Sequence, residues 1–408
     1  MSEFEIKPRH LVMVTAGANN NKYYDMIPQG DSWVAKYGRI GSSAQSRSYP
    51  MSQWNSKYNE KIRKGYVDQT DLVQDLIAVE SPKQKSEYKA ISNRNIAEIV
   101  QRLQDMAKKV IRANYTVSSE KVTQAMVDEA QNIITGLLSV SNIDDFNSEL
   151  LALFTTIPRK MSSVTDYIAH ESSDFLKIIS REQDLLDVMR GQVVSKRPET
   201  ITVETDETPV HDRTILEELG LIFEECSNED IAKIKYALGS CSGKFKNAWK
   251  VTNLKTQERF DKFVKDNNIT DTRLLFHGSR NENWWSIIQS GLVLRPTNAI
   301  ITGKMFGYGL YYASKAQKSV GYTSLHGSYW ANGSSSTGFM ALMDVAYGKP
   351  MNAYSFDSKF YSFNYDILQK EGNGAHCLHA HAGKMLRNDE IIVYREDQST
   401  IKYLVELK

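Results

Sequence analysis

The first part of the chain has the alternation of apolar and polar residues that is typical of short β-strands. Two alternating stretches lie at residues 10–14 and 32–37, and a polar turn lies between them at residues 18–21. A helix face follows, formed by apolar residues four positions apart: Trp54, Tyr58 and Ile62. The helix is expected to end at Gly65, which is suited to a C-cap. The pattern predicts a small β-rich domain over residues 1–78.

The middle of the chain changes to helical periodicity. Two apolar stripes consist of Ile96, Ile99, Val100, Leu103 and Val110, and of Ile133, Ile134, Leu137 and Leu138. Pro158 is expected to end a further helix that contains Phe154. The pattern predicts an all-α helical bundle over residues 90–195, and the Thr- and Glu-rich stretch 196–213 reads as an exposed linker.

The last part, residues 214–408, predicts a mixed α/β domain. Amphipathic helices are expected near residues 228–238 and 255–265. Expected strands lie at residues 273–276, 309–313, 338–345, 391–394 and 403–407. The fold class predicted for the whole chain is therefore α+β and multidomain.

Composition narrows the class of protein further. A hydrophobic content of 41% and a charged content of 24% are ordinary for globular proteins, and a net charge of +1 argues against polyanion binding by the whole chain. Residues 33–66 nevertheless carry seven Lys and Arg residues against the single acid Glu60, which favours a local basic face. Three scattered cysteines indicate a reducing compartment, and neither a membrane-spanning run nor a signal peptide is expected. We expect a soluble intracellular protein.

Three motifs carry the chemistry. His277 stands at an expected strand end before Gly-Ser, Tyr311 lies in a Gly-rich hairpin, and Glu390 opens an apolar strand. In this order and spacing they resemble the His-Tyr-Glu site of the poly(ADP-ribose) polymerase family. Cleavage of the nicotinamide–ribose bond has oxocarbenium character, so a carboxylate near the ribose hydroxyls stabilises its transition state.

The resemblance implies a set of site residues in an ADP-ribosyltransferase domain built on antiparallel sheets. The implied catalytic residues are His277, Tyr311 and Glu390. The implied NAD⁺ contacts are His277, Gly278, Ser279, Arg295, Tyr311, Ser319 and Tyr322, and the implied acceptor or elongation residues are Lys318 and Glu390. Arg295 takes the part of an arginine that the family often has where this chain has Val293, and Asp389 stands where the family commonly has asparagine. NAD⁺ is implied as a substrate, without any metal.

The resemblance extends over the rest of the chain. The stretch Phe154–Pro158 is similar to a segment of the helical regulatory domain of DNA-activated family members. The N-terminal domain resembles the WGR domain, with Tyr37-Gly38-Arg39 in place of Trp-Gly-Arg. The DNA-binding residues implied by this match are Tyr37, Arg39, Lys57 and Lys61.

Histidines near the C-terminus allow a second interpretation. His376, His379 and His381 could suggest a metal site, but a loop setting without nearby partners favours a solvated or acceptor-loop role. Tyr312 is expected in the core, since it points away from Tyr311 on a strand.

The function that these motifs and the resemblance favour is DNA-break-activated transfer of ADP-ribose, as a polymer, from NAD⁺ to protein acceptors that include the protein itself. Two alternatives stay open: transfer of a single ADP-ribose, and a catalytically silent scaffold that binds NAD or DNA. The expected partners are DNA strand breaks and acceptor proteins, without a membrane. The expected location is nuclear in a eukaryote and cytoplasmic otherwise, and the oligomeric state stays open.

Overall fold

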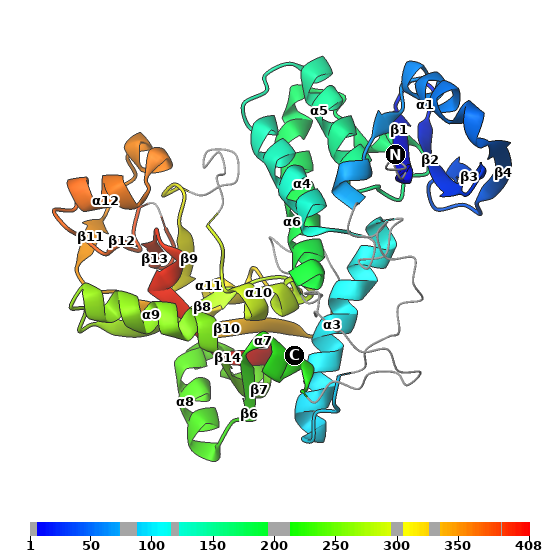
Figure 1. Cartoon of the computed structure of the whole chain (residues 1–408). Helices are drawn as coiled ribbons and strands as arrows, with labels where there is room; N and C mark the ends of the chain where they lie inside the picture. Colours follow the sequence, from blue (N-terminus) through cyan, green and yellow to red (C-terminus); the bar gives the residue numbers. More distant parts are fainter. Residues whose placement is uncertain are drawn as a thin grey trace. The chain divides into compact units, whose positions relative to one another are not determined.

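The computed structural model describes residues 6–73, 88–115, 122–194, 213–294, 305–325, 335–384 and 386–408. The chain divides into two compact units, each coloured by sequence in Figure 1. The first unit comprises Met1–Gln84 and Lys108–Val203, and the second comprises Lys85–Ala107 and Glu204–Lys408. All but the last residue of the expected linker 196–213 lie outside the described residues.

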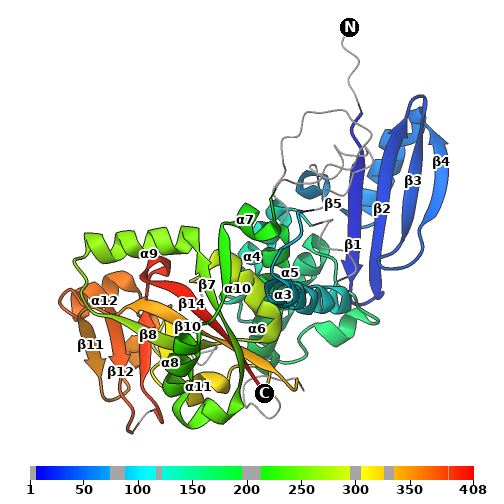
Figure 2. The same ribbon diagram turned by 90° about the horizontal axis from the view of Figure 1, so that it is seen from below.

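The N-terminal part of the first unit is an antiparallel sheet in the order β4-β3-β2-β1-β5, seen side by side in Figure 2. Its strands are β1 (Arg9–Thr15), β2 (Asn20–Gln29), β3 (Ser32–Arg39), β4 (Gln45–Pro50) and β5 (Val67–Asp68). Helix α1 (Trp54–Arg63) packs through Trp54 edge-on against the fully buried Trp33, with ring centroids 5.4 Å apart. Gly65 has a φ of 88°, the left-handed conformation expected just after a helix end. The β-rich module is therefore confirmed.

Three long helices complete the first unit: α4 (Gln124–Leu137), α5 (Ile143–Thr156) and α6 (Phe175–Val194). Thr123 and Asn142 cap the starts of α4 and α5 with their side-chain oxygens. Helix α5 ends just before Pro158, as the sequence predicts. The rings of Phe146 and Phe175 stack with centroids 3.9 Å apart, which joins α5 to the start of α6.

Helix α3 (Arg94–Asn114) is divided between the two units after Ala107. Its apolar stripe, predicted from sequence, is buried within the second unit: Ile96, Ile99, Val100 and Leu103. Arg102 of the same turn pairs with Glu406, a carboxylate whose side chain is only 2% exposed. The segment expected to form one bundle, residues 90–195, is thus split inside α3.

The second unit is built on a nine-stranded sheet in the order β11-β12-β13-β9-β8-β10-β14-β7-β6. The strands are β6 (Leu221–Glu225), β7 (Phe245–Asn253), β8 (Thr272–Gly278), β9 (Leu310–Ala313), β10 (Gly338–Ala346), β11 (Pro350–Ala353), β12 (Cys377–Ala380), β13 (Glu390–Val393) and β14 (Ser399–Leu407). Neighbouring strands are antiparallel except β11 and β12. The helices are α7 (Ile215–Leu219), α8 (Asn228–Leu238), α9 (Leu254–Asp266), α10 (Trp284–Ser290), α11 (Ala316–Val320) and α12 (Tyr365–Glu371). This arrangement confirms the mixed α/β domain on antiparallel strands.

Strand β10 lies between two apolar cores. Phe339, Ala341 and Met343 join the core that contains Trp284 and Trp285, while Met340 and Leu342 join a second core. Successive side chains of a strand point to opposite faces, so a strand covered on both faces must be apolar throughout. This explains the unbroken apolar run Phe339–Met343 within β10, which pairs with β8 and its histidine.

Candidate active site

His277, Tyr311 and Glu390 lie on three adjacent strands of the second unit. His277 is the second-last residue of β8, Tyr311 is on β9, and Glu390 opens β13, in the sheet order β13-β9-β8. Tyr311 pairs with Ile392, two residues beyond Glu390, so the Tyr311 and Glu390 side chains share one face of the sheet. The fold therefore brings together three residues that are far apart in sequence.

The imidazole of His277 is oriented by the backbone of its neighbour. Its Nδ1 lies 3.0 Å from the carbonyl oxygen of Tyr311, and a carbonyl only accepts, so Nδ1 carries the proton. The neutral ring then presents Nε2 as a hydrogen-bond acceptor. The ring also packs edge-on to Trp284, at 6.4 Å between centroids. A ribose hydroxyl is a suitable donor to Nε2.

Gly278 is required by a close backbone approach. A Cβ at this position would lie 2.0 Å from the carbonyl oxygen of Ser319, closer than real Cβ contacts. The missing side chain lets the end of α11 and the following turn lie directly against the end of β8. Ser319 is 4% exposed here, and the Oγ of Ser279 accepts from the Asn283 amide at 3.2 Å.

Tyr311 is tied to the Gly-rich turn before it. Its hydroxyl donates to the carbonyl of Gly307 and accepts from the N–H of Phe306, both at 3.1 Å. Burial raises the pKa of Tyr311, which keeps the phenol neutral. Tyr312 points to the other face, is 2% exposed, and donates to Ser399 Oγ at 2.6 Å, as expected for a core residue.

Glu390 is a nearly buried carboxylate paired with a lysine. It is 8% exposed, and its Oε1 forms an ion pair with Nζ of Lys318 on α11. Tyr322, by contrast, is 41% exposed. Burial raises the pKa of Tyr322, and the charge of Glu390 raises it further. Glu390 also acts on Tyr311 in this way, so one carboxylate, one ammonium and two tyrosines share the site.

Two family models match this chain. The poly(ADP-ribose) polymerase catalytic domain matches residues 228–408, and the WGR domain matches residues 7–73. The poly [ADP-ribose] polymerase-like protein 100L of Invertebrate iridescent virus 6 is 34% identical over 190 residues, which cover 45% of this chain and 96% of that protein. The chain belongs to the poly(ADP-ribose) polymerase family.

Two further relatives of this chain differ in the share of their own length that the match covers. Protein 101L of the same virus is 31% identical over 232 residues, covering 56% of this chain and 93% of that protein. Poly [ADP-ribose] polymerase 2-B of Oryza sativa subsp. japonica is 35% identical over 133 residues, covering 31% of this chain and 20% of that enzyme.

Membership of the poly(ADP-ribose) polymerase family makes this chain an NAD⁺ ADP-ribosyltransferase. NAD⁺ is therefore its substrate, proteins are its acceptor class, and the WGR domain indicates nucleic-acid binding. No helix among the described residues is long and apolar enough to cross a membrane.

The remaining predicted site residues divide into two groups. Arg295 lies outside the described residues. The predicted DNA contacts all have neighbours within the first unit: Tyr37 stacks on Tyr24, Lys61 lies over the Tyr24 ring, Lys57 pairs with Glu60, and Arg39 donates to the carbonyl of Asn19.

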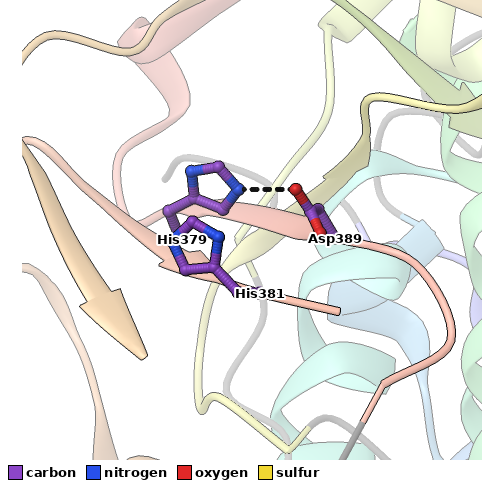
Figure 3. Close-up of side chains that lie close together, drawn as sticks. All are labelled: His379, His381 and Asp389. Carbon is purple, nitrogen blue, oxygen red and sulfur yellow. Dashed lines mark hydrogen bonds and ion pairs between the residues drawn. The ribbon is translucent and has the colours of Figure 1, made fainter. Parts of the chain in front are cut away.

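The surroundings of the C-terminal histidines correct one expectation. They were expected to lack nearby partners, but His379 bonds Asp389 at 3.1 Å (Figure 3). His379 also bonds the Tyr347 hydroxyl at 2.7 Å. Sequence patterns did not reveal this cluster, because the four-residue strand β12 was not predicted. The His-x-His spacing of His379 and His381 was the available signal, since alternate residues of a strand share a face.

Proposed function

We propose that this enzyme builds poly(ADP-ribose) on protein acceptors, itself included, and that DNA breaks activate it. The observation that carries the proposal is the Glu390–Lys318 pair on the sheet face that also bears Tyr311. A carboxylate placed beside a stacking ring suits both cleavage of NAD⁺ and activation of an acceptor hydroxyl.

We propose a protein contact for the nicotinamide ring, its carboxamide and the adenosine ribose of NAD⁺. Tyr311 and Tyr322 are proposed to sandwich the nicotinamide ring, and its carboxamide is proposed to bond the Gly278 backbone and Ser319. His277 Nε2 accepts from an adenosine ribose hydroxyl, with Ser279 and Arg295 completing the contacts. These contacts place the nicotinamide–ribose bond near Glu390 and so lower the entropic part of the barrier.

The reaction then exchanges one bond at the ribose for another. The C1′–N bond breaks, nicotinamide leaves with the bonding electron pair, and the acceptor oxygen forms a bond to C1′. Glu390 stabilises the oxocarbenium charge and polarises the acceptor, and the acceptor proton passes to solvent. When the acceptor is a hydroxyl of a bound ADP-ribose, the same step lengthens the chain, with Lys318 near the incoming group.

DNA control is proposed to act through the first unit. Arg39, a predicted DNA contact, donates to the carbonyl of Ser162 at 3.2 Å, and Asn21 donates to the carbonyl of Arg159 at 3.1 Å. Arg159 in turn pairs with Glu182 of α6, both side chains being 2% exposed. DNA that competes for Arg39 would therefore disturb a connected set of bonds ending in the helices.

Labelled NAD⁺, added to the full chain with and without nicked DNA, tests the proposal. A ladder of products that grows with DNA is expected. A single shifted band would contradict polymer formation and indicate transfer of a single ADP-ribose. Absence of label would contradict any transfer and indicate a catalytically silent scaffold. Arg39→Ala should lower the response to DNA more than basal activity, whereas Arg63→Ala, an exposed residue of α1, should change it less.

A further inference from the structure

Among the described residues, one group of three side chains has the composition and spacing of a metal site. One potential ligand atom from each of His379, His381 and Asp389 lies within 4.8 Å of those of the others (Figure 3). We propose that these side chains bind a divalent transition-metal ion, Zn²⁺ being the best match. This proposal does not rest on the proposed transfer chemistry, and it can fail or hold independently because metal binding is measured without NAD⁺.

Strand pairing explains how the three residues meet. His379 lies opposite Ile391, so it shares a face with Asp389, while Ala380 lies opposite Glu390. His381 follows two residues after His379, and their rings stack with centroids 3.9 Å apart. The cluster therefore lies on the sheet face opposite to that of the Glu390 side chain.

His379 is held at both ring nitrogens. Nδ1 lies 2.7 Å from the Tyr347 hydroxyl, and Nε2 lies 3.1 Å from Oδ2 of Asp389. A hydroxyl can donate or accept, so Tyr347 suits either neutral tautomer of the ring. In the metal-free ring a proton on Nε2 is donated to Asp389. When the proton is instead on Nδ1 and donated to Tyr347, Nε2 has a lone pair and a metal can take the place between Nε2 and Asp389. Tyr347 is itself fixed by Arg273, whose guanidinium lies 3.3 Å from the ring centroid.

His381 and Asp389 are oriented in the same manner. Nε2 of His381 lies 2.8 Å from Oδ1 of Asn352, which only accepts, so the proton of the neutral ring is on Nε2 and Nδ1 has the lone pair. Oδ1 of Asp389 accepts from the N–H of Ala382 at 2.8 Å, which leaves Oδ2 on the histidine side. Each ligand thus has an outer partner, as metal-binding residues usually do.

The donor set selects the kind of metal. Two imidazoles and one carboxylate suit Zn²⁺ and its neighbours in the transition series, whereas Mg²⁺ and Ca²⁺ prefer oxygen ligands alone. Asp389 is 34% exposed, so water has access to a fourth position. Bonds of about 2.0–2.1 Å place tetrahedral ligands roughly 3.3 Å apart. The three ligand atoms lie within 4.8 Å of one another, so binding requires them to reach the tetrahedral separation.

Titration of the full metal-free chain with Co²⁺, followed by its visible d–d absorption, tests the proposal. We expect one equivalent to give tetrahedral bands that Zn²⁺ then abolishes by competition. His381→Gln and Asp389→Asn should each weaken binding at least about tenfold, and so should Tyr347→Phe, which removes an outer partner. Thermal unfolding of each variant checks that the fold is kept.

His10→Gln provides the matched control. His10 also pairs with an aspartate, Asp25, but belongs to no group of three ligands among the described residues. This variant should bind Co²⁺ as the parent does. Absence of tetrahedral bands in the parent, or equal binding by folded His381→Gln and Asp389→Asn variants, would overturn the proposed site.

Discussion

The carboxylate of Glu390 is surrounded by groups that respond to its charge. Lys318 neutralises it directly, and Tyr311 and Tyr322 are kept in their phenol forms beside it. A nearly buried carboxylate of this kind acts more strongly on a developing positive charge than an exposed one, because less water screens it.

Glu390→Gln should therefore keep the fold and NAD⁺ binding but lose most of the transfer. The amide has no negative charge to stabilise the ribose, so we expect kcat to fall by about 10²–10³. Quantifying nicotinamide release at saturating NAD⁺ measures this. Glu371→Gln, at an exposed pair with Lys359, is the control. Parental turnover in the Glu390 variant would remove this residue from the mechanism.

Gly278→Ala tests the close approach of α11 to β8. The added methyl would meet the Ser319 carbonyl at 2.0 Å, so backbone must move where the nicotinamide amide is proposed to bind. Overpacking of this kind costs about 1–3 kcal/mol, and we expect a lower Tm and weaker NAD⁺ binding. Calorimetry measures both. Gly243→Ala, where a Cβ would meet nothing within 4 Å, should leave NAD⁺ binding unchanged; equal behaviour of the two variants would contradict the assignment.

At the scale of elements, one buried acid adds an ion pair to the apolar packing of α3 on the nine-stranded sheet. Glu406 of β14 accepts from Arg102 and from Lys246 at 2.9 Å. Burial alone would raise the pKa of Glu406, but these two cations lower it below the usual value of 4.5. Its folded pKa is thus below its unfolded pKa. The pair contributes its full stability above pH 4.5, and this is lost as the pH falls through the folded value.

Glu406→Gln should lower the free energy of unfolding of the second unit by about 1.5 kcal/mol at pH 7. This is the lower end of the range for charged hydrogen bonds, and we choose it because both cations are half exposed. The difference from the parent should shrink as the pH is lowered below 4.5. Hydrogen exchange of α3 amides at several pH values measures it. Glu224→Gln, at an exposed pair with Lys250, should have little effect. A pH-independent difference would show that the charge is not responsible.

Sequence patterns predicted these elements unevenly. Helix α8 has the predicted bounds, because Ser227 and Asp230 form a capping box and Gly239 follows its end. Strand β12 was not predicted, because unlike the equally short β9 and β13 it contains none of the β-branched or aromatic residues that favour strands. The α3 stripe predicted a buried helix face but not its partner, because an apolar stripe fits any apolar surface of suitable shape. His277 and Tyr311 could be predicted from the glycines around them in the sequence. The contact between His379 and Asp389 could not, because it depends on the pairing of β12 with β13.

For the whole molecule, the division inside α3 changes how control by the helices is best tested. Deleting residues 92–192 would remove the buried stripe of Ile96, Ile99, Val100 and Leu103 from the core of the second unit. Deleting Lys108–Val203 instead keeps this stripe and removes the helices of the first unit. Comparing the two deletions therefore separates the effect of removing the helices of the first unit from the effect of destabilising the core of the second unit.

The shorter deletion should be active without DNA. We propose, from the resemblance to DNA-activated family members, that the helical domain restrains activity in the absence of DNA. Each 1.4 kcal/mol of restraint removed is about tenfold in active population. We expect at least about a tenfold gain in DNA-free nicotinamide release. The 92–192 deletion should unfold at lower temperature. A Lys108–Val203 deletion that binds NAD⁺ but is no more active than the DNA-free parent would contradict the restraint.

The hydrogen bond from His277 to the Tyr311 carbonyl has a consequence for the choice between dinucleotides. Since the proton is held on Nδ1, Nε2 is the acceptor in the proposed contact with the adenosine ribose. A ribose hydroxyl has a hydrogen to donate, whereas a phosphate ester at the same position brings negative charge and, near neutral pH, little chance of a proton. In the proposed binding mode, the tautomer set by one backbone carbonyl would therefore favour NAD⁺ over NADP⁺.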